Sequence, residues 1–175
     1  MRRKYPIYIG QLGDHCGASR VQADALFAQG RNLPQLYAGL LTFTRKEDGI
    51  EIPWGDGGCE PENIVDALRR MGFFPVHIKR NGTLEMLTKI IKRGLFPHVC
   101  YTDPEYQEDH WATVVGVNGQ VELADPYTRA VKNMNTCVFY DAWTLTQNGE
   151  KLNNTIVPVH DASLLKRLGW LKAYA

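Results

Sequence analysis

The sequence predicts an α+β fold in a single domain that spans residues 1–175. Apolar residues recur at helical spacing through the first half of the chain, whereas extended apolar segments occupy most of the second half, as in α+β proteins. The dipeptide Asn118-Gly119 lies between two β-rich segments, and it is the strongest short-range signal for an antiparallel hairpin. With 175 residues, the chain is long enough for one substantial hydrophobic core.

The composition argues against nucleic-acid or membrane binding as the main activity. Hydrophobic residues make up 44% of the chain, charged residues 22%, and the net charge is +1. No apolar run approaches the roughly 20 residues that span a bilayer, and no apolar segment of a signal peptide follows the basic N-terminus. We therefore expect a cytoplasmic protein without a cofactor or metal. Four widely spaced cysteines, with no Cys-x-x-Cys motif, indicate free thiols: Cys16, Cys59, Cys100 and Cys137.

Proline and glycine mark the ends of most predicted helices. Proline is favoured at the first helical position and glycine just after the last one. A further amphipathic helix with basic residues is expected near the C-terminus. The predicted helices cover residues 14–29, ended by Gly30, residues 34–41, residues 61–71, ended by Gly72, residues 83–93, ended by Gly94, and residues 162–174.

Apolar and β-branched segments predict the strands. They cover residues 5–9, 73–78, 95–101, 110–117, 120–125 and 155–159. Residues 137–143 fit a short helix or a strand, and residues 127–135 are polar without a predicted element. Residues 45–60 predict a flexible loop that contains Trp54. This loop is either the rim of a binding cleft or an ordinary surface loop anchored by that side chain.

The segment from Gln11 to Arg20 predicts a turn that leads into a helix with Cys16 in its first turn. Asp14 is a favoured N-cap residue, which places Cys16 at the second helical position. The unpaired N–H groups and the positive end of the helix dipole favour a thiolate there. A buried structural cysteine is the alternative. A metal site of Asp14, His15 and Cys16 is disfavoured, because adjacent side chains in a turn diverge and no fourth ligand has suitable spacing.

The predicted hairpin brings His110 close to Asp125. If Asn118-Gly119 is a two-residue turn, the residues that flank it face each other and Ala112 faces Asp125. His110 then points to the same side of the sheet as Asp125, as its diagonal neighbour. A carboxylate orients an imidazole and stabilises its protonated form, which suits a general base beside a cysteine. A surface histidine near a surface aspartate is the alternative, and a shift of one residue in register would separate the pair.

The order of these parts resembles the papain-like cysteine peptidases. The shared features are a glutamine shortly before Cys-Gly at a helix start, two helix–strand units, a histidine at the head of a strand and Asp-Pro at the end of the next. Over roughly residues 8–145 the chain is most similar to the double-glycine leader peptidases, which process bacteriocins and quorum peptides, and to their stand-alone relatives. The resemblance implies a papain-like fold in which an N-terminal helical part, with a central helix carrying Cys16, packs on an antiparallel sheet.

Carried over residue by residue, the resemblance implies a catalytic triad. Cys16 is then the nucleophile, His110 is the base and Asp125 orients His110. Gln11 donates from its side-chain amide, together with the Cys16 backbone N–H, to the oxyanion. Two positions depart from the family pattern: Gln11 stands five residues before Cys16, one fewer than usual, and His15 stands where aspartate is common.

The sequence therefore predicts a cysteine peptidase that cleaves a peptide or isopeptide bond through an acyl-enzyme on Cys16. The family implies a cleavage site of glycine or other small residues. Trp54 and Trp111 are candidate cleft-lining residues, with ordinary core as the alternative for each. The chain lacks the phosphate loop of an ATPase, so any partner proteins are expected to be supplied in trans. Two other functions remain open: a deamidase or transglutaminase-like acyltransferase with the same triad, and an inactive papain-like binding module.

Overall fold

A six-stranded antiparallel sheet is the centre of the fold. The computed structural model describes residues 5–6, 8–11, 16–42, 45–47, 50–52, 59–73, 77–147 and 150–159. The strands of the sheet are β3 (His77–Lys79), β4 (His98–Thr102), β5 (Asp109–Val117), β6 (Gln120–Asp125), β7 (Ala130–Asn135) and β10 (Thr155–Val157). Their order across the sheet is β3-β10-β4-β5-β6-β7. β5 and β6 thus lie side by side in the sheet.

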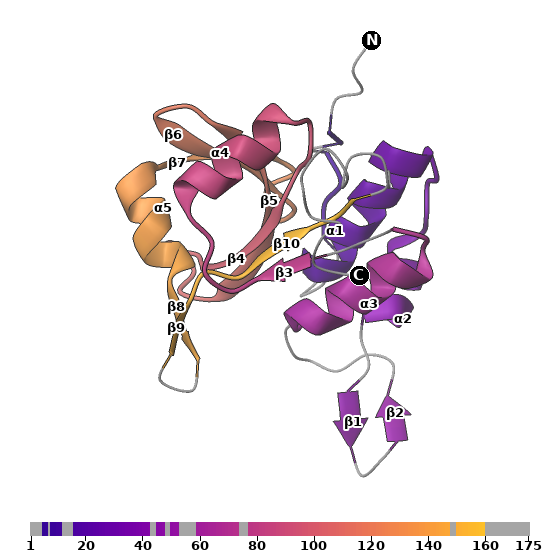
Figure 1. Ribbon diagram of the computed structural model, residues 1–175. Coiled ribbons are helices and arrows are strands. Elements are labelled where there is room, and N and C mark those ends of the chain that lie inside the picture. The colour runs from indigo at the N-terminus through magenta and orange to yellow at the C-terminus, as the bar shows by residue number, and fades with distance from the viewer. Residues whose placement is uncertain are drawn as a thin grey trace, which may run out of the picture.

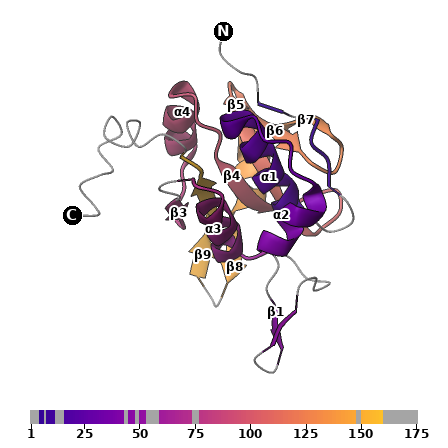
Figure 2. The ribbon, with the colours of Figure 1, turned by 90° about the vertical axis from the view of Figure 1, so that its right-hand side faces the viewer.

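Helices cover both faces of this sheet. They are α1 (Cys16–Asp24), its π-helical continuation η1 (Ala25–Gln29), α2 (Gln35–Thr42), α3 (Pro61–Arg70), α4 (Leu84–Lys92) and α5 (Thr136–Trp143). Figure 1 shows α1, α2 and α3 on one side of the sheet and α4 and α5 on the other. In Figure 2, the first three helices lie together in front of the sheet. The sheet is therefore the middle layer of three.

The ends of the helices follow the local sequence signals. η1 ends at Gly30, whose φ of 69° is left-handed, as the sequence predicts. Pro61 is the first residue of α3, and Gly72 follows that helix with a φ of 83°. Thr83 caps α4, because its side-chain oxygen accepts a hydrogen bond from the backbone N–H of Met86 at 3.1 Å.

Successive apolar residues of β5 point to opposite faces of the sheet, and each face packs in its own hydrophobic cluster. Trp111 packs in the cluster that contains Val21 of α1 and Ile64 of α3. Its neighbour Ala112 and the next inward residue on that side, Val114, pack in the cluster formed with α4 and α5. Because successive strand residues point to opposite faces, a strand buried on both sides has an almost continuous apolar sequence, as β5 does.

Two predicted elements differ from the structure. The described residues of segment 5–9 form no strand, and the N–H of Ile9 instead closes a turn on the carbonyl of Pro6. The polar segment 127–135 contains β7, which pairs with β6 along its whole length. β7 is an edge strand whose side chains are mostly exposed, with Met134 as its one buried residue, so it lacks the apolar pattern by which strands are recognised.

Two small hairpins were also not predicted from the sequence. β1 (Arg45–Glu47) pairs with β2 (Ile50–Ile52) inside the segment predicted as a loop, and β8 (Leu145–Gln147) pairs with β9 (Glu150–Leu152). Both project from the body of the molecule (Figure 1). Asp48-Gly49 and Asn148-Gly149 stand between the paired strands in the sequence, and such dipeptides are hairpin signals. Trp54 and the predicted helix 162–174 lie outside the described residues.

Trp143 is the last residue of α5. Its replacement is expected to have the largest effect on stability among the side chains of this layer. It is fully buried, its ring lies 5.2 Å from that of Phe139, and its indole N–H donates to the carbonyl of Asn154 at 3.1 Å. Trp143→Ala is expected to lower the free energy of unfolding by about 3–5 kcal/mol. Trp143→Phe keeps most of the ring volume and is expected to cost clearly less. Urea denaturation of both variants measures the difference, and equal losses would contradict the packing explanation.

Candidate active site

Cys16 is the first described residue of α1. It is 6% exposed and lies in the hydrophobic cluster of α1 and α3. Ser19 donates from its hydroxyl to the carbonyl of Cys16 at 2.7 Å, which fixes the first turn. A Cβ atom on Gly17 would lie 2.9 Å from the Cβ of Cys59, so glycine lets the start of α1 approach the segment before α3. The predicted cap Asp14 lies outside the described residues.

His110 and Asp125 form the hydrogen-bonded pair that the sequence predicts. His110 is the second residue of β5, Asp125 is the last residue of β6, and antiparallel pairing brings these positions to the same end of the sheet. The Nε2 atom of His110 lies 2.9 Å from Oδ1 of Asp125. The same carboxylate oxygen accepts the backbone N–H of Tyr127 at 2.8 Å. Asp125 is therefore held from two directions and is 1% exposed.

The predicted register of this hairpin is correct at its open end and wrong at its turn. Thr113 pairs with Ala124, as the facing of Ala112 and Asp125 requires. Near the turn, Val117 pairs with Val121 rather than with Gln120, so the pairing there is offset by one residue from the predicted register. The register shifts after Val114, where a β-bulge takes up the extra residue. Without this bulge, one of the two site residues would point to the other face of the sheet.

The imidazole of His110 contacts Cys16 as well as Asp125. Burial lowers the pKa of His110, but hydrogen bonds with Asp125 and with the Cys16 side chain outweigh it and raise the pKa to about 9. Because Nε2 faces Asp125, Nδ1 is the ring atom left for Cys16. The ring of Tyr101 stands edge-on to the imidazole, with 5.9 Å between centroids. The structure thus brings Cys16, His110 and Asp125 together.

The electrostatics of the pair favour its charged form. Burial raises the pKa of Asp125, but the hydrogen bond from His110 and the backbone N–H of Tyr127 outweigh that effect and hold the pKa below its usual value. The pKa of His110 is raised while that of its partner is lowered, so an imidazolium beside a carboxylate is the favoured state near neutral pH.

A cavity of about 330 Å³ opens beside His110. Gln11 belongs to its wall, and the backbone N–H of Gln11 donates to the carbonyl of Pro126 at 2.9 Å. That bond places Gln11 next to the corner that follows β6. The rings of Tyr106 and Tyr127 lie 5.0 Å apart and form an aromatic part of the wall. The described lining residues are Gln11, Asp103, Tyr106, Glu108, Asp109, His110 and Tyr127.

The described residues in the wall of the cavity carry more negative than positive charge. They contribute three carboxyl groups, those of Asp103, Glu108 and Asp109. Lys132 of β7 lies 2.8 Å from Oδ2 of Asp103. Burial raises the pKa of Asp103, but this lysine is foremost among the contacts that outweigh burial and lower it. One carboxylate is thus compensated within the protein, and the wall keeps a net negative charge that favours a cationic ligand group.

Trp54 and Trp111 are the two tryptophans that the sequence offers as cleft-lining residues, and the structure describes only Trp111. Trp111 is 3% exposed, packs in the same cluster as Cys16, and donates from its indole N–H to the carbonyl of Cys59 at 2.8 Å. It therefore belongs to the core, which is the alternative that the sequence left open, and it fastens the segment before α3. Trp54 lies outside the described residues.

A buried polar network on α1 and the neighbouring strands was missed from the sequence. It joins Tyr5, Arg20, Asp24, His98 and Thr113, which are all at most 6% exposed. Cys16, Arg20 and Asp24 follow one another at intervals of four residues. This spacing places them on one face of α1, and it is the signal that could have identified two charged members of the network.

The described residues contain neither a membrane-spanning helix nor a cluster of metal-binding side chains. No helix in them is long and apolar enough to cross a bilayer. No three histidine, cysteine, aspartate or glutamate side chains in them form a group suited to a metal ion. Asp14 and His15, which the disfavoured metal site would require, fall in a gap between the described ranges.

Comparisons with known proteins identify the fold. No protein-family model matches the sequence, and no curated protein matches it. The peptidase domain of Streptococcus ComA, a bifunctional ABC transporter involved in a quorum-sensing pathway, aligns with a TM-score of 0.58 and 18% identity, over 86% of this chain and 96% of that domain. The peptidase domain of Streptococcus mutans ComA aligns with a TM-score of 0.49 and 15% identity, over 86% of this chain and 97% of that one. The first comparison confirms the predicted α+β, papain-like fold.

Proposed function

We propose that this protein is a cysteine peptidase that cleaves a peptide or isopeptide bond with Cys16, His110 and Asp125 as its catalytic triad. The observation that carries the proposal is the imidazole of His110, which contacts Cys16 and Asp125 at once. A nucleophile, a base and a group that orients the base form the arrangement by which a thiol performs acyl transfer. The shared fold with a peptidase domain supports the same conclusion.

The first half of the proposed reaction forms an acyl-enzyme. The thiolate of Cys16 attacks the carbonyl carbon of the scissile bond, and a C–S bond forms as the carbonyl becomes an oxyanion. The Nδ1–H of His110 then protonates the leaving nitrogen as the C–N bond breaks. Asp125 keeps the ring oriented through Nε2, at 2.9 Å, and stabilises its positive charge. The amine product leaves, and a thioester on Cys16 remains.

The second half hydrolyses the thioester. His110, now neutral, accepts a proton from water, and the resulting hydroxide attacks the thioester carbonyl. The C–S bond breaks, Cys16 departs as a thiolate beside the imidazolium, and the substrate leaves with a new carboxyl end. The side-chain amide of Gln11 and the backbone N–H of Cys16 are the proposed oxyanion donors in both halves. The presence of Gln11 and His110 in one cavity wall supports this role.

We further propose a peptide or protein substrate with small residues at the scissile bond. Access to Cys16 is narrow, since the residue is 6% exposed, and small side chains let the scissile carbonyl come close to the sulfur. The chain shares its fold with a peptidase domain of a transporter in a quorum-sensing pathway, so secreted or signalling peptides and their precursors are the first substrates to examine.

A cleavage screen against peptide libraries tests the proposal, with Cys16→Ala as the blank. Mass spectrometry is expected to find new peptide ends with the wild-type protein and none with the variant. Cys59→Ala is the matched control, because burial raises the pKa of that neighbouring thiol well above its usual value and it has no role in the reaction. Ammonia release or amine incorporation instead of new ends would assign the deamidase or acyltransferase function. Identical digests from wild type and Cys16→Ala would overturn the proposal.

The charge of the cavity wall predicts a preference for positively charged substrates. Peptides with lysine or arginine near the scissile bond are expected to have a higher kcat/KM than their leucine counterparts. Glu108→Gln is expected to reduce this preference about threefold, as for one exposed charge. Glu105→Gln removes a charge from the same loop without altering the described lining of the cavity and serves as the control. Salt at about 0.5 M should weaken the preference by screening, and a preference that is insensitive to both changes would refute this electrostatic explanation.

A further inference from the structure

Arg20 is a fully buried cation that connects separate parts of the chain. It lies on α1, one turn after Cys16, and is 0% exposed. One terminal nitrogen donates to the carbonyl of Ile9 at 2.8 Å. The other lies 3.0 Å from the carbonyl of Ala124 and 3.3 Å from the hydroxyl of Thr113. The guanidinium thus joins α1 to the N-terminal segment, to β6 and to β5.

Each of these contacts lies close to a residue of the proposed active site. Ile9 is two residues before Gln11, and Ala124 directly precedes Asp125. The third contact is on β5, the strand that carries His110. A movement of the guanidinium would therefore change the backbone positions of all three site residues relative to α1.

Arg20 is also linked to the backbone of the proposed nucleophile. Its Nε and one terminal nitrogen lie 3.4 Å from the hydroxyl oxygen of Ser19. That hydroxyl donates to the carbonyl of Cys16 at 2.7 Å. Two side chains, those of Ser19 and Arg20, therefore connect the first turn of α1 to the strands that carry His110 and Asp125.

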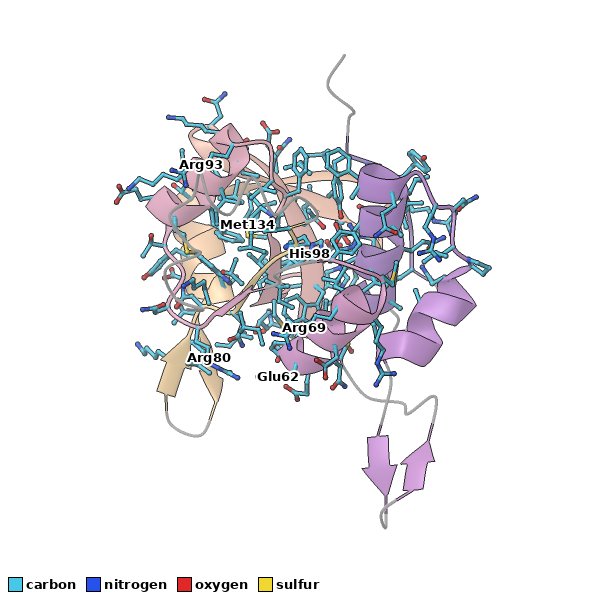
Figure 3. The ribbon with its side chains drawn as sticks, turned by 45° about the vertical axis from the view of Figure 1, so that its right-hand side comes forward. Glu62, Arg69, Arg80, Arg93, His98 and Met134 are labelled. Atoms are coloured by element: carbon cyan, nitrogen blue, oxygen red, sulfur yellow. The ribbon has the colours of Figure 1, made fainter. Side chains whose placement is uncertain are left out.

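The network that holds Arg20 also contains a buried carboxyl group, that of Asp24. Asp24, one turn further along α1, accepts a hydrogen bond from Tyr5 at 3.2 Å and contacts Nε2 of His98 at 2.6 Å. Nδ1 of His98 in turn lies 2.8 Å from the hydroxyl of Thr113. Figure 3 shows His98 at the centre of the molecule, beside α1. A buried cation held by several partners of this kind is costly to displace.

We propose that Arg20 is a positioning residue that sets the distance between Cys16 on α1 and the His110–Asp125 pair on the sheet. This inference rests on the proposed peptidase function. Only a planar guanidinium presents several N–H groups in fixed directions, so it can donate to the carbonyls of Ile9 and Ala124 simultaneously. A lysine ammonium at the end of a flexible chain keeps the charge and loses this geometry.

The test compares Arg20→Lys and Arg20→Met with Tyr5→Phe. The tyrosine variant removes hydrogen bonds from the same network but none from a backbone group next to a site residue. Thermal unfolding is measured for all variants, and the kinetics are compared at temperatures where each is fully folded. Arg20→Lys keeps the charge and remains informative where Arg20→Met does not fold.

We expect Arg20→Lys to lower kcat at least tenfold while KM changes less than about threefold, because small displacements of reacting groups affect the chemical step strongly. The alkaline limb of its pH–rate profile should also move to lower pH, because His110 loses part of its contact with Cys16 and Asp125. Tyr5→Phe should leave kcat and the limb unchanged. A loss of kcat in Arg20→Lys that Tyr5→Phe matches, or no loss at all, would overturn the inference. If the wild-type protein cleaves no better than Cys16→Ala, the proposed function fails instead, and the two failures are thus distinguishable.

Discussion

Replacing His110 by alanine is expected to lower kcat/KM for peptide cleavage about 10⁴-fold, at the upper end of what a general acid–base group contributes. The imidazole both activates the Cys16 thiol and protonates the leaving amine, so both halves of the reaction lose their proton carrier. The hydrogen bonds that His110 makes with Cys16 and Asp125 are the physical reason. Steady-state kinetics on the best peptide of the screen measure the effect.

Thiol labelling gives an independent measurement of the same prediction. At about pH 6, iodoacetamide should modify Cys16 selectively in the wild type, because an imidazolium stabilises a neighbouring thiolate, and this selectivity should disappear in His110→Ala. Burial raises the pKa of Cys59 and Cys100 well above their usual values, so these thiols should stay unlabelled. Cys137 is exposed, and a Cys137→Ser background removes its contribution. Uniform slow labelling of all thiols in the wild type would identify an inert, papain-like binding module.

Asp125→Asn is expected to lower kcat about 10²-fold at pH 8, because the asparagine still accepts a hydrogen bond but no longer stabilises the imidazolium. In the wild type the pKa of His110 is about 9, so activity should fall as the pH rises through that value and the ring loses the proton it donates. Without the Asp125 carboxylate, the pKa of His110 moves toward its ordinary value of 6.5. The alkaline limb of the pH–rate profile should therefore shift to lower pH.

Several titratable groups surround the imidazole of His110. The variant Asp125→Asn tests which of them has the largest effect on the pKa of that ring. Cys16 approaches from α1, Asp125 from β6 and Tyr101 from β4, while Asp103, Glu108 and Asp109 share the cavity wall with His110. If the alkaline limb stays near pH 9 in Asp125→Asn, Cys16 or the other carboxylates rather than Asp125 hold the proton on the ring, and the proposed role of Asp125 is wrong.

The same pKa shifts give the pair a pH-dependent contribution to stability. The pKa of His110 is raised from 6.5 to about 9 in the folded state, so its contribution is complete below pH 6.5 and is lost as the pH rises through 9. The pKa of Asp125 is lowered from 3.8, so its contribution is present above that pH and is lost on acidification. The midpoint of thermal unfolding of Asp125→Asn should differ most from the wild type between these limits.

Local signals predicted the parts of the fold that local chemistry controls. The glycine and proline positions located the ends of η1, α3 and α4, because a left-handed φ or a missing N–H acts within a few residues. The edge strand β7 was missed, because its exposed side chains have no apolar period. Its pairing partner β6 defines it, and pairing is a long-range property. The hairpin β1–β2 had a local signal in Asp48-Gly49 that the charged surrounding sequence obscured.

The sequence by itself predicted the proximity of His110 and Asp125, because both lie near the open end of one short hairpin. Only the structure showed the bulge after Val114 that keeps the two side chains on one face of the sheet. The sequence also determined that Cys16 lies at the start of a helix. Only the tertiary structure decided that Cys16 contacts His110, since 94 residues separate them and no local rule relates a helix to a distant strand. The same holds for Trp111, which joins the core, and for Arg20, whose acceptors come from three segments. Side-chain contacts across such distances depend on how the helix packs on the sheet, and that packing is a property of the whole chain.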